Sequence, residues 1–93
     1  MLVYNQVIKN IFQLNIGGEN MVKMELINKE EVRLSIAKKG MTLKDFSIHI
    51  GISQVYLTQI LKGYRIPSPT VSAKIAKGLG VEIDHIFNIS VHQ

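Results

Sequence analysis

The residues best suited to binding chemistry lie in one short segment of predicted helix. Leu57 and Ile60 recur there at helical spacing, which indicates that they face a core. The remaining residues of the segment are then left toward solvent: Gln54, Val55, Tyr56, Thr58 and Gln59. Glutamine amides donate and accept hydrogen bonds. A soluble domain has little reason to expose a valine beside a tyrosine, so this face is a candidate contact surface.

Residues suited to catalysis or metal binding do not accompany this face. The chain has no cysteine, and His49, His85 and His92 have no mutual spacing suited to a metal ion. Gly17-Gly18 is not followed by the lysine and hydroxyl residue of a phosphate-binding loop. Nothing in the sequence suggests a nucleophile, a base and an orienting residue that converge. We therefore expect neither an enzyme nor a cofactor, metal or small-molecule substrate.

Basic charge is concentrated around the candidate surface. The formal net charge is +4 and the sequence pI about 9.5, a balance that favours polyanionic partners without identifying one. Seven basic residues stand against three acidic ones between Lys29 and Arg65. A chain of 93 residues with 46% hydrophobic content is enough for one compact domain. Without cysteine or a long apolar run, we expect a soluble cytoplasmic protein.

The elements that position this surface are marked by helix-start and helix-stop signals. Asn28, Thr42 and Ser53 each look like an N-cap between two apolar residues, and Ser68-Pro69 is a fourth start. Four glycines fall where a helix would end in a left-handed residue: Gly40, Gly51, Gly63 and Gly80. The predicted helices, which form an all-α bundle, cover residues 29–39, 43–50, 54–62, 69–78 and 83–87.

The first 27 residues lack the helix-start and helix-stop signals of the rest of the chain. We expect an N-terminal extension at 1–27 and the helical domain at 28–93. An amphipathic helical pattern opens the extension: Val3, Tyr4, Val7, Ile8, Ile11 and Phe12. Apolar residues then alternate at Val22, Met24 and Leu26. This apolar stripe predicts a packing partner for the segment, which is either the helical bundle of the same chain or a second copy of the protein. Alternatively, residues 1–20 are not natural protein, because Gly17 to Met21 can be encoded by a ribosome-binding site before a start codon, and the native start is then Met21.

The segment Leu43 to Leu61 resembles the helix-turn-helix of the lambda-repressor-like (Cro/cI, or XRE) family. The match rests on a small residue, a turn glycine four positions later and an aliphatic residue six after that: Ser47, Gly51 and Leu57. Apolar residues occupy the family's other core sites: Phe46, Ile50, Ile52 and Ile60. The resemblance extends from about Val32 to Phe87 and implies a five-helix bundle.

The resemblance also implies roles for individual residues on double-stranded DNA. Positions that face base edges in the major groove match Gln54, Val55, Tyr56 and Gln59. A glutamine can pair with adenine through two hydrogen bonds, and valine or a tyrosine ring can pack on a thymine methyl group. Phosphate contacts are expected from Thr42, Lys44, Ser53, Thr58, Lys62, Tyr64 and Arg65.

One departure from the family pattern predicts a contact in the core. Many members carry an arginine in the first helix and a glutamate near the end of the recognition helix, which form an ion pair. The matching residues here are Ile36 and Leu61. Because both are apolar, we expect them to pack together in place of the ion pair.

The resemblance implies a sequence-specific transcriptional regulator, a repressor in the leading interpretation, that binds operator DNA through helix 54–62. Family members commonly pair, so we expect a homodimer. Its interface is either the N-terminal stripe or a C-terminal group made of Ile86, Phe87, Ile89 and Val91. The alternative is an antitoxin-like or protein-binding helical module with weak, non-specific DNA binding.

Overall fold

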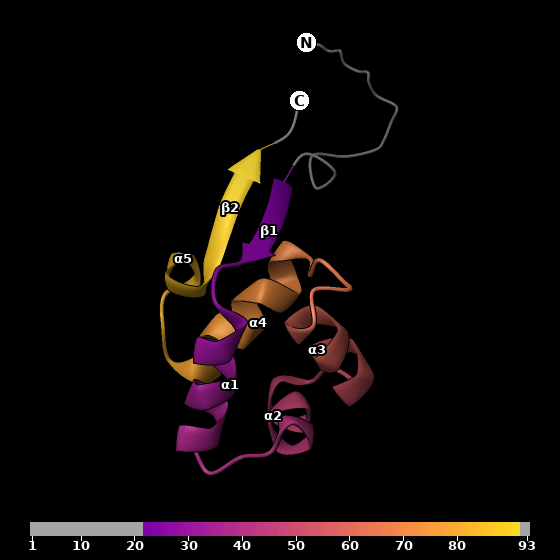
Figure 1. Cartoon of the computed structure of the whole chain (residues 1–93), viewed down its shortest axis with the longest axis vertical. Helices are drawn as coiled ribbons and strands as arrows, with labels where there is room; N and C mark the ends of the chain where they lie inside the picture. Colours follow the sequence, from indigo (N-terminus) through magenta and orange to yellow (C-terminus); the bar gives the residue numbers. More distant parts are fainter. Residues whose placement is uncertain (1–21, 92–93) are drawn as a thin grey trace.

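The structure, a computed structural model, describes residues 22–91 of the chain as five helices and a two-stranded sheet (Figure 1). The elements in chain order are β1 (Val22–Leu26), α1 (Lys29–Lys38), α2 (Leu43–Ile50), α3 (Gln54–Leu61), α4 (Pro69–Leu79), α5 (Ile83–Ile86) and β2 (Phe87–Val91). All five predicted helices are present, and their bounds lie within one residue of those expected. Within residues 22–91, no helix has the length and apolar content needed to cross a membrane.

Helices α1 to α4 begin at the predicted residues because a side chain satisfies backbone N–H groups of each first turn. The Asn28 side chain accepts hydrogen bonds from two backbone amides at the start of α1, and Ser53 and Ser68 cap α3 and α4. All four predicted stop glycines have positive φ. At α1, however, the Glu31 carboxylate does not close a capping box but lies 3.0 Å from His85 Nε2.

The expectation of a strictly all-α bundle is corrected by the antiparallel pairing of β1 with β2. The register places Val22 opposite Val91, Met24 opposite Ile89 and Leu26 opposite Phe87. Both strands alternate apolar and polar residues, so one face of the sheet is entirely apolar. Helix α5 is only four residues long, and the chain turns extended at Phe87. The fold is therefore mostly helical with a small sheet that joins the two ends of the described chain.

The N-terminal amphipathic stripe and the proposed start at Met21 lie outside the described residues. The sheet follows this segment directly, beginning at Val22. Met24 is 2% exposed and belongs to the core, so β1 is packed on the same folded unit as the helices. Helix α4 contacts β1.

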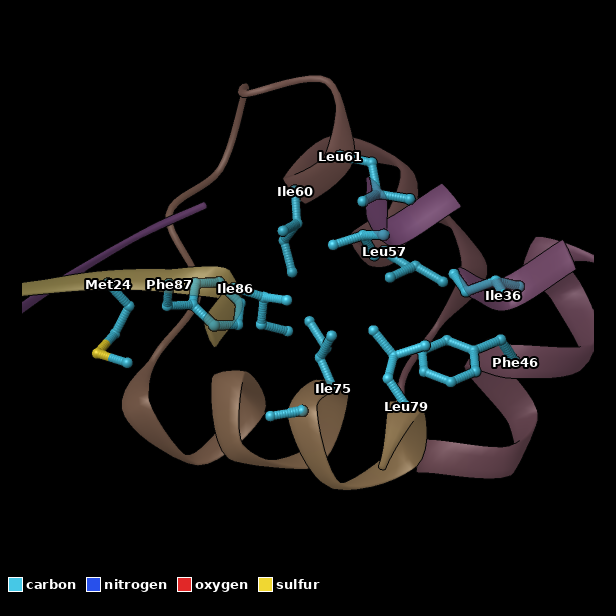
Figure 2. Packing of buried hydrophobic residues seen from close by; sticks show 12 residues of the cluster. Met24, Ile36, Phe46, Leu57, Ile60, Leu61, Ile75, Leu79, Ile86 and Phe87 are labelled. Carbon is cyan, nitrogen blue, oxygen red and sulfur yellow. The ribbon is translucent and has the colours of Figure 1, made fainter. Parts of the chain in front are cut away.

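The core forms between α3 and α4 and is extended by the sheet. Figure 2 shows Leu57 and Ile60 of α3 pointing toward Ile75 and Leu79 of α4. Phe46 of α2 belongs to the same buried cluster. Helix α2 also approaches α4 closely: a Cβ at Gly78 would come within 2.6 Å of Ile50 Cγ2. The three helices α2, α3 and α4 are thus held together by apolar contacts.

Ile36 and Leu61 are each 1% exposed and belong to one apolar cluster. Both positions of the family's ion pair are apolar in this chain, so no charged side chain is buried here without a partner. Burial in a common core is consistent with the predicted substitution of packing for an ion pair. It also anchors the last turn of α3.

Truncation of Leu61 tests this anchor. We expect Leu61→Ala to lower the free energy of unfolding by about 2–5 kcal/mol, because it leaves a cavity in a packed core. Leu61→Glu should cost more, since its carboxylate would be buried without a partner. Urea unfolding measures both. Leu34→Ala, the same change on a side chain that is 56% exposed, is the matched control and should change stability little. A Leu61→Glu protein as stable as the wild type would contradict the packing role.

Helix α2 begins with a reciprocal capping box. Thr42 Oγ1 accepts a hydrogen bond from the Asp45 backbone N–H, and Asp45 Oδ2 accepts one from the Thr42 backbone N–H, each at 3.1 Å. The backbone hydrogen bond from Thr42, then the bond with the Thr42 side chain, lowers the pKa of Asp45 below its ordinary value of 3.8. The box fixes the first turn of the helix that packs behind α3.

The capping box gives a prediction for stability and its pH dependence. Thr42→Ala should lower the free energy of unfolding by about 0.5–2 kcal/mol, because the Asp45 N–H loses its acceptor, whereas Thr42→Ser keeps the oxygen.

Asp45 stabilises the fold in its ionised form. Its contribution is present above pH 3.8 and is lost as the pH falls through the lowered pKa. Urea unfolding should therefore show a difference between wild type and Asp45→Asn at neutral pH that shrinks in acid. A difference that does not change with pH would argue against the box.

Candidate nucleic-acid interface

The candidate interface is built on α3, which is fixed by its inner face. Leu57, Ile60 and Leu61 are buried, and Ser53 Oγ accepts a hydrogen bond from the Tyr56 backbone N–H at the first turn. A helix held along its inner face presents the opposite side to solvent in one orientation. Val55, on that side, is 67% exposed.

The turn between α2 and α3 sets how the two helices meet. Gly51 has φ +79°, and its N–H donates to the Ser47 carbonyl oxygen at 2.9 Å. The next amide, Ile52 N–H, donates to the same carbonyl at 2.9 Å. Ser47 is 2% exposed, and its hydroxyl donates to the Lys44 carbonyl oxygen, so this buried hydroxyl is satisfied. The small residue lets α2 and α3 approach each other, and the turn glycine supplies the positive φ of a tight turn.

The outer face of α3 and the residues after it surround one shallow hollow. Residues of both predicted groups line it. The predicted base contacts are Gln54, Val55 and Gln59, and the predicted phosphate contacts are Thr58, Lys62 and Tyr64. Amide, hydroxyl and ammonium donors therefore surround an exposed apolar side chain. The phenol of Tyr64, which is 75% exposed, stands at the end of this surface. Such a surface suits a partner with hydrogen-bond acceptors, negative charge and apolar groups.

Tyr56, which the helical spacing placed toward solvent, does not line the hollow: it is half-buried and packs against the core. The guanidinium carbon of Arg65 lies 5.1 Å from the centroid of its ring. Arg65 Nη1 is also 3.5 Å from Gln59 Oε1. Two predicted base-contacting residues are thus linked by a residue predicted to contact phosphate. The sequence does not predict this link, because nothing in the spacing of these residues indicates that the loop returns over α3.

The remaining predicted phosphate contacts lie at helix N-termini. Thr42 and Lys44 are at the start of α2, outside the hollow, and Ser53 is at the start of α3. The capping oxygens of Thr42 and Ser53 accept backbone hydrogen bonds. The Ser53 hydroxyl proton is thereby left to donate elsewhere, whereas the Thr42 hydroxyl lies beside the Asp45 carboxylate. The helix dipole adds partial positive charge at the start of α3.

Within residues 22–91, no three His, Asp or Glu side chains come together as a metal site would require. The described groups around α3 are hydrogen-bond donors, amides and apolar side chains. The arrangement is therefore suited to binding a polyanion with a structured surface.

Comparison with known proteins supports this chemistry. A family model described as helix-turn-helix (HTH_3) matches residues 30–86, which is more than half of the chain and covers α2 and α3 entirely. No curated protein matches the chain at a significant level. From the family match, with the turn at Gly51 and the exposed face of α3, the chain belongs to the Cro/cI-like helix-turn-helix family (XRE family) and is a DNA-binding regulator.

Proposed function

We propose that the protein is a sequence-specific transcriptional repressor that places α3 in the major groove of operator DNA. The observation that carries this proposal is the exposed amide and apolar face of a helix whose inner face is buried. Such a helix can enter a groove without reorganising the core. Repression then follows from occupancy of the operator, which needs no second domain.

The exposed groups fit the chemistry of base pairs and phosphates. The Gln54 amide can donate to and accept from adenine, and Val55 can pack on a thymine methyl group. Lys62 lies one residue beyond α3 and supplies a mobile positive charge for a phosphate. The Ser53 hydroxyl proton, at the N-terminus of α3, suits the same role. Base contacts give specificity and phosphate contacts give affinity and register.

A homodimer would add a second half-site to the few base pairs that one domain covers. Of the C-terminal residues predicted to form its interface, Ile86 and Phe87 are buried in the domain core at 3% and 1% exposure. Ile89 and Val91 are 45% and 64% exposed and remain available to a partner. Both lie on the apolar face of the sheet, beyond the part of that face that Met24 and Phe87 bury in the core, and this exposed end is our proposed dimer surface.

Selection of bound sequences from random DNA tests the proposal. We expect a two-fold related site with half-sites about 34 Å apart, one turn of the DNA helix. Gln54→Ala should cost roughly 1–3 kcal/mol on the selected site and relax base choice at one position per half-site, because two hydrogen bonds to a base are lost. Asn88→Ala is the matched control, because it truncates an exposed amide that lies on β2 and not on α3. Binding that is weak and indifferent to sequence would favour the protein-binding alternative.

The phosphate role of Lys62 is tested by salt. We expect Lys62→Ala to weaken binding to specific and unrelated DNA alike and to reduce the slope of log affinity against log salt by about one. The selected sequence should not change, because a phosphate contact carries no base information. Lys77→Ala, in the last turn of α4, is the control for loss of one positive charge. An unchanged slope for Lys62→Ala would remove this residue from the phosphate contacts.

A further inference from the structure

Arg65 is held against the base-contacting side of α3 by contacts to two of its residues. Its guanidinium carbon lies 5.1 Å from the Tyr56 ring centroid, and its Nη1 lies 3.5 Å from Gln59 Oε1. We propose that Arg65 is a specificity-determining residue that orients Gln59 toward one class of base, and does not serve as a phosphate contact. This inference rests on the proposed function of α3.

The backbone directs Arg65 back over the helix. The chain leaves α3 through Gly63, which has φ +82°. The backbone N–H groups of Tyr64 and Arg65 both donate to the Gln59 carbonyl oxygen, at 2.8 and 3.3 Å. These bonds tie the start of the loop to the last turn of α3. Arg65 is therefore held beside Gln59 by the main chain as well as by its side chain.

The contact determines which atoms of the Gln59 amide face the partner. A guanidinium group only donates hydrogen bonds, so the amide atom turned toward Arg65 is the oxygen. The NH₂ group is then the end of the amide left for DNA. An NH₂ donor matches acceptor atoms in the major groove: guanine presents two, N7 and O6, and thymine presents O4, whereas the N7 acceptor of adenine lies beside its N6 donor. The paired donor and acceptor that adenine requires is instead disfavoured at Gln59.

The Tyr56 ring supplies the second constraint on Arg65. A planar guanidinium packs on an aromatic face and hydrogen-bonds in its own plane at the same time. Lysine carries the same charge but has no planar group with fixed donors. Arg65→Lys therefore keeps the positive charge at this position and removes the geometry that orients Gln59.

The experiment is selection of bound sequences from random DNA with the full chain, followed by affinity measurements over a range of salt. For the wild type we expect guanine or thymine at the base opposite Gln59, which Gln59→Ala identifies as the position where preference is lost. Arg65→Lys and Arg65→Ala should each reduce preference at that same position by roughly tenfold or more and admit adenine. Combining Arg65→Ala with Gln59→Ala should give no further loss of preference there.

Salt dependence distinguishes the proposal from a phosphate contact. We expect Arg65→Ala, which removes the charge, to keep the wild-type slope of log affinity against log salt, with Lys62→Ala as the variant that lowers it by about one. A uniform loss of affinity in Arg65→Ala, with a lower slope and an unchanged selected sequence, would overturn the role in specificity. An adenine opposite Gln59 in the wild type would also overturn it. Failure of the wild type to select any sequence would instead refute the proposed function itself. Thermal unfolding checks that each variant is folded.

Discussion

The buried inner face of α3 is the constraint on which the rest of the interface depends. Leu57, Ile60 and Leu61 are almost fully buried, and burying one such side chain contributes about 1.5–3 kcal/mol. The N-cap at Ser53 contributes about 1 kcal/mol, and an exposed contact such as Arg65 on Tyr56 about 0.5–1 kcal/mol. Packing therefore sets the axis and rotation of the helix. The polar contacts then order its two ends.

The small sheet completes a core that the last helix is too short to close. Helix α5 has four residues, and an isolated helix of that length has no stability of its own. Phe87 and Met24 bring buried side chains from the two strands to the same cluster. The backbone N–H of Ile27 also donates to the Ile86 carbonyl oxygen at 2.9 Å. The sheet thus connects the beginning of α1 to the end of α5 and stabilises the helices that carry the interface.

Most of the interface follows from local patterns in the sequence. The caps at Thr42 and Ser53 depend on residues within three positions, and the turn at Gly51 depends on one glycine and its neighbours. The outer face of α3 follows from the spacing of Leu57 and Ile60. These features were predicted correctly because each has its physical cause within about one helical turn. The environment of Arg65 was not predicted, because it depends on how a loop folds back.

The sequence by itself determined the helices, their ends and the helix-turn-helix, since hydrophobic spacing and capping act over short distances along the chain. Its alternating pattern at Val22–Leu26 was visible, but a partner for that strand was not. Only the tertiary structure decided that Phe87–Val91 pairs with it and that Arg65 lies over Tyr56. Strand pairing joins segments at opposite ends of the described chain, and the position of a side chain beyond a turn depends on the packed surface it meets. Alternation within a strand does not identify its partner, and no periodicity marks where a side chain beyond a turn will lie.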